Sequence, residues 1–441
     1  MDASGARQPR ILARAEHPIS RKNISDNALK VLYRLHGAGF KAYLVGGSVR
    51  DLMLGRQPKD FDAATDARPN EIRRLFRNSR LIGRRFRLVH VFFKDGVVEV
   101  STFRKVPDPN EQEGGEGELL ITSDNTFGSP EEDAFRRDFT VNALFYSIED
   151  FSVIDYVGGV EDLENRVIRV IGDPDIRFRE DPVRMMRACE FAARLGFGIE
   201  PRTQEAIDRH RRELAKASPA RLTDELLQLL RCGHSGRALQ WMLELGLLED
   251  LLPETLAIVS ASQRRYGDFS QLLPTLDRRC QAGEAFSDVA VLAVLLLPAV
   301  LVRRFALEAE RGRAISKHAG ERLIEQVVEP FVRRFALSKA RAQGLFQALS
   351  LFQEFGVEPR TPAERVRLAR RPSFGDALAL LAVLVEATGE GAELLALWRQ
   401  AYERVGRRQP PAPAKDEQEE DLLEAAPERG ARRERRRRRR R

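Results

Sequence analysis

The segment LVGGSVRDLMLGRQPKDFD, residues 44–62, concentrates the residue types that phosphate chemistry needs. Gly46 and Gly47 follow a short apolar run and open a helical pattern, so a phosphate could approach the backbone N–H groups there closely. Arg50 lies one turn into that helix and can add charge-assisted hydrogen bonds to the same phosphates. The pattern predicts a site for the phosphates of a bound molecule.

Paired carboxylates, Asp60 and Asp62, close the same segment. On an extended chain, residues two apart point to one face, so both carboxylates would lie side by side. Their repulsion is relieved by a cation between them, and oxygen ligands suit Mg²⁺. A bare D-x-D more often marks a solvated face, but beside the glycine turn and Arg50 it predicts metal-assisted phosphoryl or nucleotidyl transfer.

A third carboxylate, Glu99, lies between valines in the predicted strand VVEVSTFR. A lone carboxylate among buried neighbours is costly unless it is paired or bound to a metal. Two interpretations stay open: Glu99 is a third catalytic carboxylate, as a metal ligand or a partner of the reacting hydroxyl, or it forms a salt bridge with Arg104 or another nearby arginine.

The elements that must position these residues indicate an α+β fold. A helix is predicted over residues 27–35, with a strand before Gly46 and an extended segment over 59–65. Two β-rich runs, 81–93 and 97–104, are separated by a hairpin signal. Residues 105–128 read as a mobile surface loop, and from residue 130 onward the pattern is mostly helical. The sequence therefore predicts a small mixed sheet with helices, followed by helical domains.

Length and composition favour a soluble, multidomain protein. The 441 residues suggest two or three domains, and 43% hydrophobic residues suffice for sizeable cores. The longest apolar stretch, residues 289–302, contains Pro298 and is too short to span a bilayer, so we expect a buried helix and no integral membrane association. The first residues carry no apolar signal region, and the three cysteines are far apart, which favours a cytoplasmic location.

The positive charge of the chain is concentrated at its end. Residues 429–441 carry ten Arg and one Glu, a net +9, whereas the whole chain carries +7 and the remainder therefore −2. Residues 416–428 carry seven acids and no base. Opposite charge blocks after a Pro-rich stretch predict a disordered extension, and the Arg run predicts an arm for a polyanion, most simply RNA. A solvated end with no function is the alternative.

Five sequence blocks in fixed order, over residues 40–232, resemble one family. LVGGSVRDLMLG with KDFD is similar to the signature of the nucleotidyltransferase superfamily, and more narrowly of the class II group of CCA-adding enzymes and bacterial poly(A) polymerases. The blocks EEDAFRRDFTVNAL, DYVGGVEDLENRVIRVIG, REDPVRMMRACEFAARLG and PARLTDELLQLL resemble its later motifs. The resemblance implies a nucleotidyltransferase head, a helical neck, a helical body and a disordered basic tail.

The resemblance also implies a role for each matching residue. Gly46, Gly47 and Arg50 would hold a nucleoside triphosphate, and Asp60 and Asp62 would hold two Mg²⁺ ions. The nucleotide would further contact residues of the two following motifs: Arg137, Asp138, Asn142, Glu180, Asp181, Arg184 and Arg187. Among these, Glu180, Asp181 and Arg184 would read the base, and Asp181 and Arg184 would share one helix face because they lie three residues apart.

The basic stretch LIGRRFRLVHVFF resembles the poly(A) polymerase branch of the family more than the CCA-adding branch. Its arginines Arg84, Arg85 and Arg87 would bind RNA, together with the tail arginines Arg435, Arg436, Arg437, Arg438, Arg439, Arg440 and Arg441. An edge strand protected by its basic residues is the alternative interpretation of this stretch.

The function that this resemblance implies is template-independent addition of AMP from ATP to RNA 3′ ends, with release of pyrophosphate. CCA addition to tRNA is the first alternative, and an RNA-binding adaptor with an inactive head is the second. Expected partners are RNA 3′ ends, ATP, and RNA-decay or RNA-chaperone proteins. The predicted segments are a flexible leader (1–22), head (23–150), neck (151–235), RNA-binding body (236–406) and tail (407–441).

Overall fold

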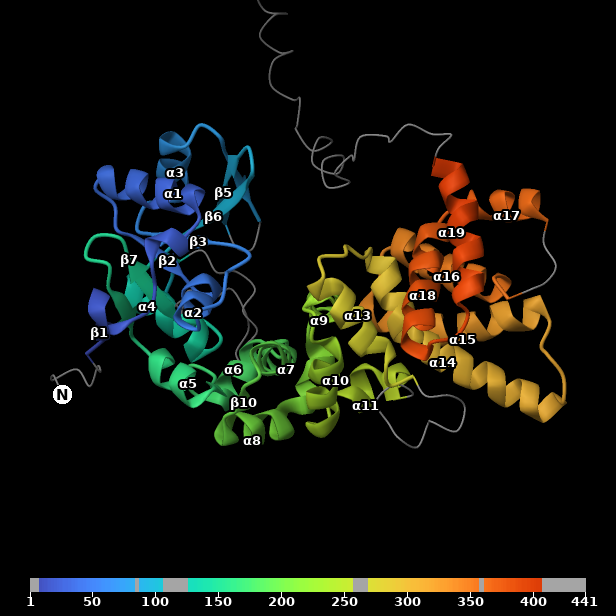
Figure 1. Cartoon of the computed structure of the whole chain (residues 1–441). Coiled ribbons are helices and arrows are strands. Elements are labelled where there is room, and N and C mark those ends of the chain that lie inside the picture. The colour runs from blue at the N-terminus through green and yellow to red at the C-terminus, as the bar shows by residue number, and fades with distance from the viewer. Residues whose placement is uncertain (1–7, 84–86, 106–125, 257–268, 357–360, 407–441) are drawn as a thin grey trace, which may run out of the picture.

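The computed structural model describes residues 8–83, 87–105, 126–256, 269–356 and 361–406. A sheet with flanking helices lies at one end of the molecule, and an all-helical part lies at the other (Figure 1). Helices α6 (Pro174–Glu180) and α7 (Arg184–Leu195) lie between the two. The predicted α+β class, with a mixed sheet before helical segments, is confirmed.

The head is built on one eight-stranded sheet with the order β1-β8-β7-β2-β3-β6-β5-β4. Strands β3 and β6 run parallel, and the other described neighbours run antiparallel. The strands are β1 (Arg10–Leu12), β2 (Ala42–Val45), β3 (Asp62–Thr65), β4 (Ser79–Ile82), β5 (Leu88–Phe93), β6 (Gly96–Thr102), β7 (Leu144–Ser147) and β8 (Val153–Asp155). The predicted hairpin between the two β-rich runs is β5–β6, which turns at Lys94 and Asp95.

Helices cover one face of this sheet. Helix α1 (Asp26–Gly37) packs on β2, β3 and β6, and α3 (Pro69–Leu75) packs on β4 and β5. The N-terminus of α1 is capped, because the Ser25 hydroxyl accepts a hydrogen bond from the backbone of Ala28. The face that carries Asp62 and Glu99 is therefore the opposite one.

The sheet extends further along the chain than predicted. Residues 10–12 fall in the predicted flexible leader, yet they form β1 and pair with β8, which lies beyond residue 150. The buried His17 also ties this segment to the sheet, because its Nε2 lies 2.8 Å from the backbone oxygen of Phe151. The expectation of a mostly helical chain from residue 130 was wrong for β7 and β8. Most of the predicted loop over 105–128 lies outside the described residues.

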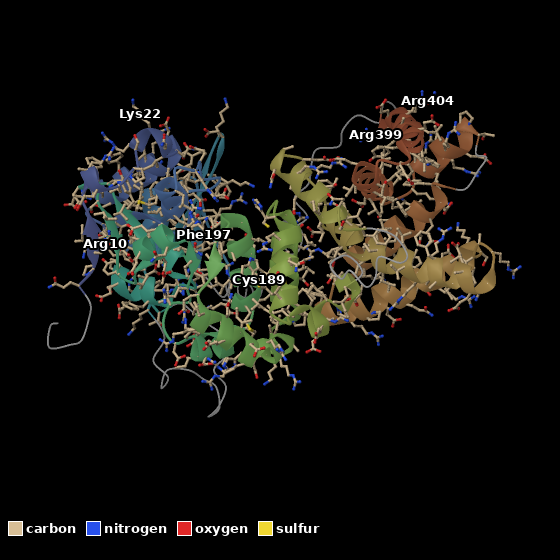
Figure 2. All side chains as sticks on the ribbon, turned by 60° about the horizontal axis from the view of Figure 1, so that its bottom comes forward. Arg10, Lys22, Cys189, Phe197, Arg399 and Arg404 are labelled. Carbon is tan, nitrogen blue, oxygen red and sulfur yellow. The ribbon has the colours of Figure 1, made fainter. Side chains whose placement is uncertain are left out.

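Short helices connect the sheet to the neck. Helix α2 (Gly47–Met53) follows β2, and α4 (Pro130–Arg136), the short η4 (Thr140–Asn142) and α5 (Gly159–Asn165) come next. A two-stranded parallel sheet, β9 (Val167–Ile168) and β10 (Gly198–Ile199), flanks α7. Helices α8 (Pro201–His210) and α9 (Pro219–Arg231) complete the neck. Figure 2 shows Cys189 and Phe197 in this region, within the stretch of side chains that joins the head to the helical part.

The body is all helical in its described residues. Its helices are α10 (Ser235–Glu244), α11 (Leu248–Leu251), α13 (Leu272–Gln281), α14 (Asp288–Arg311), α15 (Lys317–Phe335), α16 (Lys339–Glu354), α17 (Pro362–Ala369), α18 (Phe374–Thr388) and α19 (Ala392–Gly406). Helix α14 contains the apolar stretch with Pro298 and is longer than that stretch. It could cross a membrane by length and composition alone, but its apolar part is mostly buried against other helices, which confirms the predicted core helix.

Candidate active site

A cavity of about 870 Å³ opens beside the Asp62 face of the sheet, and head, neck and body residues all line it. Twelve of its lining residues are Arg or Lys and eight are Asp or Glu. Such a surplus of positive charge suits a polyanionic ligand, and the volume suits one of nucleotide size. Residues 231–234 at the end of the neck line it, and the body contributes Cys280 and Gln281.

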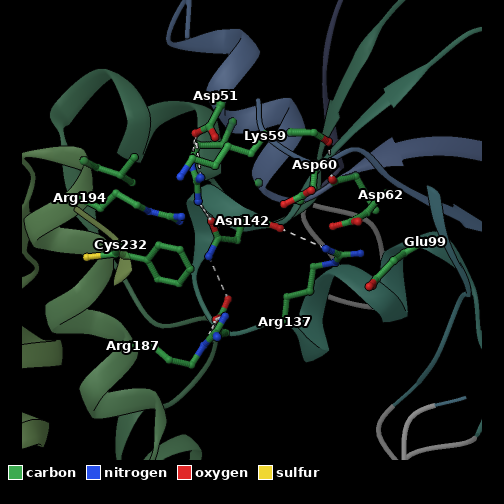
Figure 3. A pocket seen from close by; sticks show the side chains of 18 of the residues that line it. Asp51, Lys59, Asp60, Asp62, Glu99, Arg137, Asn142, Arg187, Arg194 and Cys232 are labelled. Atoms are coloured by element: carbon green, nitrogen blue, oxygen red, sulfur yellow. Dashed lines mark hydrogen bonds and ion pairs between the residues drawn. The ribbon is translucent and has the colours of Figure 1, made fainter. Parts of the chain in front are cut away.

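The three predicted carboxylates all line this cavity (Figure 3). Asp62 is the first residue of β3, and Asp60 lies two residues earlier on the approach to the strand. Glu99 is the register partner of Asp62 on the parallel neighbour β6, so the two side chains share one face. The Glu99 carboxylate lies 3.1 Å from Nε2 of His90 on β5. The carboxylates therefore come together through strand pairing, which sequence spacing alone does not specify.

The charge environment of Asp62 suits a cation. Burial raises its pKa to about 6, with further increases from Glu99 and Asp60 and an opposing effect from Arg137. A positive ion between the carboxylates would relieve this repulsion. Among the described residues, no group of three or more His, Cys, Asp or Glu side chains could hold a metal ion by itself. Mg²⁺ tolerates such a site, because it commonly binds one or two carboxylates and completes its shell with phosphate and water oxygens.

The glycine turn leaves room for two arginines. Gly46 has φ +70°, and a Cβ added there would lie 3.1 Å from Nη1 of Arg137. The same Arg137 nitrogen donates to the backbone oxygen of Asn142, while its Nε and Nη2 donate to the Asp133 carboxylate at 3.1 and 2.9 Å. Glycine at position 46 is therefore needed both for the backbone conformation and for the position of Arg137.

A hydrogen-bonded chain of side chains links α2 to the neck (Figure 3). The Arg50 side chain is buried and donates to Asn142 Oδ1 at 2.5 Å, and Asn142 Nδ2 donates to Asp138 at 3.2 Å. Asp138 accepts two bonds from Arg187 of α7, at 2.9 and 2.7 Å. Arg187 also donates to Glu225 of α9 at 3.2 Å. Four predicted nucleotide contacts, Arg50, Asn142, Asp138 and Arg187, are therefore joined into one hydrogen-bonded chain across head and neck.

The pKa values of this chain favour charged groups. Burial alone would raise the pKa of Asp138, but the charge and hydrogen bonds of Arg187, with those of Asn142 and a backbone amide, lower it below its usual value. Burial would likewise lower the pKa of Arg187, but Asp138 and Glu225 outweigh it and raise that pKa. Both groups are therefore held ionised.

Asp181 and Arg184 both line the cavity, but they do not share a helix face. Asp181 directly follows α6, and Arg184 is the first residue of α7, so the helix is interrupted between them. The prediction of one shared helix face is wrong, because Pro182 follows Asp181 and favours an extended conformation there. Asp181 pairs with both Nη atoms of Arg221 on α9. Glu180 does not line the cavity; its carboxylate accepts hydrogen bonds from Arg177 and Arg184.

The structure brings most of the predicted site residues together. Twelve line the cavity: Gly46, Gly47, Arg50, Asp60, Asp62, Glu99, Arg137, Asp138, Asn142, Asp181, Arg184 and Arg187. Arg87 is exposed and does not line it, and its backbone oxygen accepts a hydrogen bond from Arg104. The remaining predicted RNA-binding residues, Arg84, Arg85 and Arg435 to Arg441, lie outside the described residues.

Phe191 and Arg194 of α7 are site residues that the sequence reasoning missed. The guanidinium carbons of Arg50, Arg187 and Arg194 lie 5.4, 5.2 and 4.9 Å from the centre of the Phe191 ring, which also lines the cavity. Such stacking holds arginines in place without neutralising them. Phe191 lies seven residues and Arg194 ten residues after Arg184, so helical spacing on one face was the available signal.

Comparisons with known proteins agree with this geometry. A family model described as the poly A polymerase head domain matches residues 42–169, and one described as the probable RNA and SrmB-binding site of polymerase A matches residues 196–258. Poly(A) polymerase I of Salmonella typhi is 55% identical over 249 residues, which cover 55% of this chain and 53% of that protein. The match thus spans about half the length of that relative.

Two further relatives cover more of the chain. Poly(A) polymerase I of Haemophilus influenzae is 35% identical over 400 residues, 89% of this chain and 88% of that protein. The crystal structure of the Bacillus stearothermophilus CCA-adding enzyme in complex with CTP covers 86% of this chain and 81% of its own, with a TM-score of 0.58 and 28% identity. The similarity therefore extends beyond the head to the neck and body. This chain belongs to the family of tRNA nucleotidyltransferases and bacterial poly(A) polymerases.

Proposed function

We propose that the protein is a polynucleotide adenylyltransferase, which transfers AMP from ATP to an RNA 3′-hydroxyl and releases pyrophosphate. The observation that carries the proposal is the intact pair Asp60 and Asp62 with Glu99 in a basic cavity, in a chain related to poly(A) polymerase I. The same carboxylates argue against an adaptor with an inactive head.

The residues of the cavity divide by the part of the reactants that each would bind. Gly46, Gly47, Arg50 and Arg137 would bind the triphosphate, since they offer backbone N–H groups and guanidinium donors. Asp60 and Asp62 would hold the Mg²⁺ ions, which would supply charge neutralisation for the attacking hydroxyl and the leaving pyrophosphate. Glu99 would orient the RNA 3′-hydroxyl or contribute to the metal site.

Base selection would fall to side chains of the neck. Arg184 and the Asp181–Arg221 pair present donor and acceptor edges at the cavity wall. Because Asp181 is held by Arg221 and Arg184 by Glu180, their edges are fixed before a nucleotide arrives. A preorganised set of this kind can favour one base without a nucleic-acid template.

CCA addition to tRNA is the second candidate, because the solved CCA-adding structure covers most of the chain. The experiment that separates the two supplies ATP and CTP, separately, with a tRNA that lacks its CCA end and with an unstructured RNA. Extension of both RNAs with ATP and little use of CTP supports polyadenylation. Addition limited to C, C and A on the tRNA alone would replace it with the second candidate.

The setting of the activity is also part of the proposal. We expect a cytoplasmic enzyme that works on RNA 3′ ends and meets RNA-decay or RNA-chaperone proteins there. The family model over residues 196–258, named for RNA and protein binding, supports such contacts in the neck and early body. Affinity capture from cell extract with and without ribonuclease would separate direct protein partners from proteins that RNA bridges.

A further inference from the structure

The face of the sheet that carries the catalytic carboxylates continues over the three strands at its edge. In register, Asp62 is opposite Glu99, Glu99 is opposite His90, and His90 is opposite Arg80. Register partners project to one face, so these four side chains form a single row from the cavity to the edge strand β4. Three strand spacings correspond to roughly 14 Å, the reach of a short stretch of nucleic acid.

Large apolar side chains are exposed beside this row. Ile82, Phe92 and Val97 project to the same face as His90 and Glu99, and they are 41, 38 and 46% exposed. Phe92 and Val97 are register partners, so they form one patch. The residues that alternate with them on β5 and β6 are buried under α1 and α3: Val89, Val91, Val98 and Val100. Adjacent exposed apolar groups on one sheet face indicate a binding surface.

Cationic and aromatic groups are combined on this patch. The Arg80 guanidinium carbon lies 5.9 Å from the centre of the Phe92 ring, and the rings of His90 and Phe92 lie 6.2 Å apart in an edge-on arrangement. Arg80 is thus the cation of this face, and Phe92 lies between it and the exposed Val97.

We propose that this surface, the edge face formed by Arg80, Ile82, His90, Phe92 and Val97, binds the unpaired RNA nucleotides just upstream of the 3′ end. Bases would stack on Phe92 and Arg80 and cover Ile82 and Val97. The row toward Glu99 and Asp62 then leads the last nucleotide into the cavity. Single-stranded RNA fits better than a protein partner, because a guanidinium group and an aromatic ring lie together on a face that leads to the catalytic carboxylates.

The proposal rests on the proposed function for its substrate, but its test does not require catalysis. The variant Arg80→Gln/Phe92→Ala removes one exposed arginine and one exposed phenylalanine. Its matched control, Arg303→Gln/Phe305→Ala, removes the same pair from α14, where Phe305 is 40% exposed. Fluorescence anisotropy without ATP measures the affinity of each protein for a labelled trinucleotide and for an unstructured oligonucleotide several times longer.

We expect Arg80→Gln/Phe92→Ala to bind the long oligonucleotide at least about fivefold more weakly than the control, with unchanged binding of the trinucleotide. A photoreactive uridine a few nucleotides from the 3′ end should crosslink to residues 88–93 in the unaltered protein. Equal affinities, or crosslinks confined to other segments, overturn the proposal. If the unaltered protein adds no AMP to RNA, the proposed function fails, while the binding comparison still decides the edge face.

Discussion

At the residue scale, the site brings like charges together and supports them with oriented partners. Asp62 and Glu99 are adjacent through strand register, and Asp60 raises the pKa of Asp62 further. Arg50 and Arg137 are instead fixed by hydrogen bonds to Asn142 and Asp133. A bound cation would therefore relieve the repulsion between the carboxylates, whereas the arginines are already held in position for an anion.

The Asp60→Ala substitution should abolish nucleotide addition while the fold is retained. A carboxylate that organises a metal site contributes at least about 10³-fold to the rate, and Asp60 is exposed at the approach to β3. Single-turnover extension of an RNA with ATP measures the loss. Asp66→Ala, an exposed carboxylate at the other end of β3, is the control and should remain active. A near-normal rate for a folded Asp60→Ala protein would remove the assignment.

The Asp62→Asn substitution should stabilise the metal-free protein at neutral pH. The native pKa of Asp62, about 6, lies above its unfolded value near 3.9, so its charge opposes folding above about pH 6. The cost is at most about 3 kcal/mol and disappears below about pH 4, where both states are protonated. Urea unfolding of both proteins between pH 4 and pH 8 measures this difference.

The stabilising effect of Mg²⁺ on the unaltered protein and on Asp62→Asn tests whether Asp62 binds the ion. If Asp62 binds the ion, Mg²⁺ should raise the unfolding free energy of the unaltered protein by mass action and leave Asp62→Asn nearly unchanged. Equal stabilisation of both proteins would contradict a metal site at Asp62. A difference in stability that stays constant from pH 8 to pH 4 would instead contradict the raised pKa.

At the element scale, the β2–turn–α2 unit positions most of the phosphate contacts. Position 46 requires φ +70°, and a Cβ there would crowd Arg137. Gly55, just after α2, has φ +68° and no atom within 4 Å of an added Cβ. Both positions therefore need the positive φ that glycine adopts without strain, but only Gly46 lines the cavity.

Gly46→Ala and Gly55→Ala should each destabilise the protein by about 1–3 kcal/mol, because alanine is strained at positive φ. Only Gly46→Ala should also weaken ATP binding, since its methyl group displaces Arg137. Thermal unfolding and the Michaelis constant for ATP separate the two effects. Equal Michaelis constants for the two variants would show that the space beside Arg137 is not required.

The sequence predicted the elements that carry a local signal. The glycine turn, the carboxylate pair and the β5–β6 hairpin were all visible in residue type and spacing. Strand β7 was not, because Leu144 to Ser147 are buried on both faces and show no alternation. Pro182 signalled that the helix is interrupted between Asp181 and Arg184, but the sequence analysis treated the two residues as part of one helix. Arg221 and Glu225 lie in the block PARLTDELLQLL, but their partners Asp181 and Arg187 could not be predicted, because α9 meets α7 only in the folded chain.

At the scale of the whole molecule, the cavity requires head, neck and body together. The head supplies the carboxylates, the neck supplies the arginine chain, and the body contributes Cys280 and Gln281. The predicted tail, residues 407–441, lies outside the described part of the chain. Its contribution has to be argued from charge alone.

Deleting residues 429–441 should weaken RNA binding and reduce its dependence on salt, with little effect on stability or on the Michaelis constant for ATP. The segment carries a net +9 and has no apolar residue able to pack except Ala431, so it can act only through charge. For each phosphate of single-stranded RNA that the tail no longer neutralises, the slope of log affinity against log salt should become shallower by about 0.7. The acidic residues 416–428 would compete with RNA for the arginines, so the change in slope should be smaller than nine neutralised phosphates would give.

Binding curves at two salt concentrations test this prediction, with Arg435–Arg441 replaced by glutamine as a length-matched control. Superimposed curves for the full-length and truncated proteins at both concentrations would show that the tail is not an RNA arm.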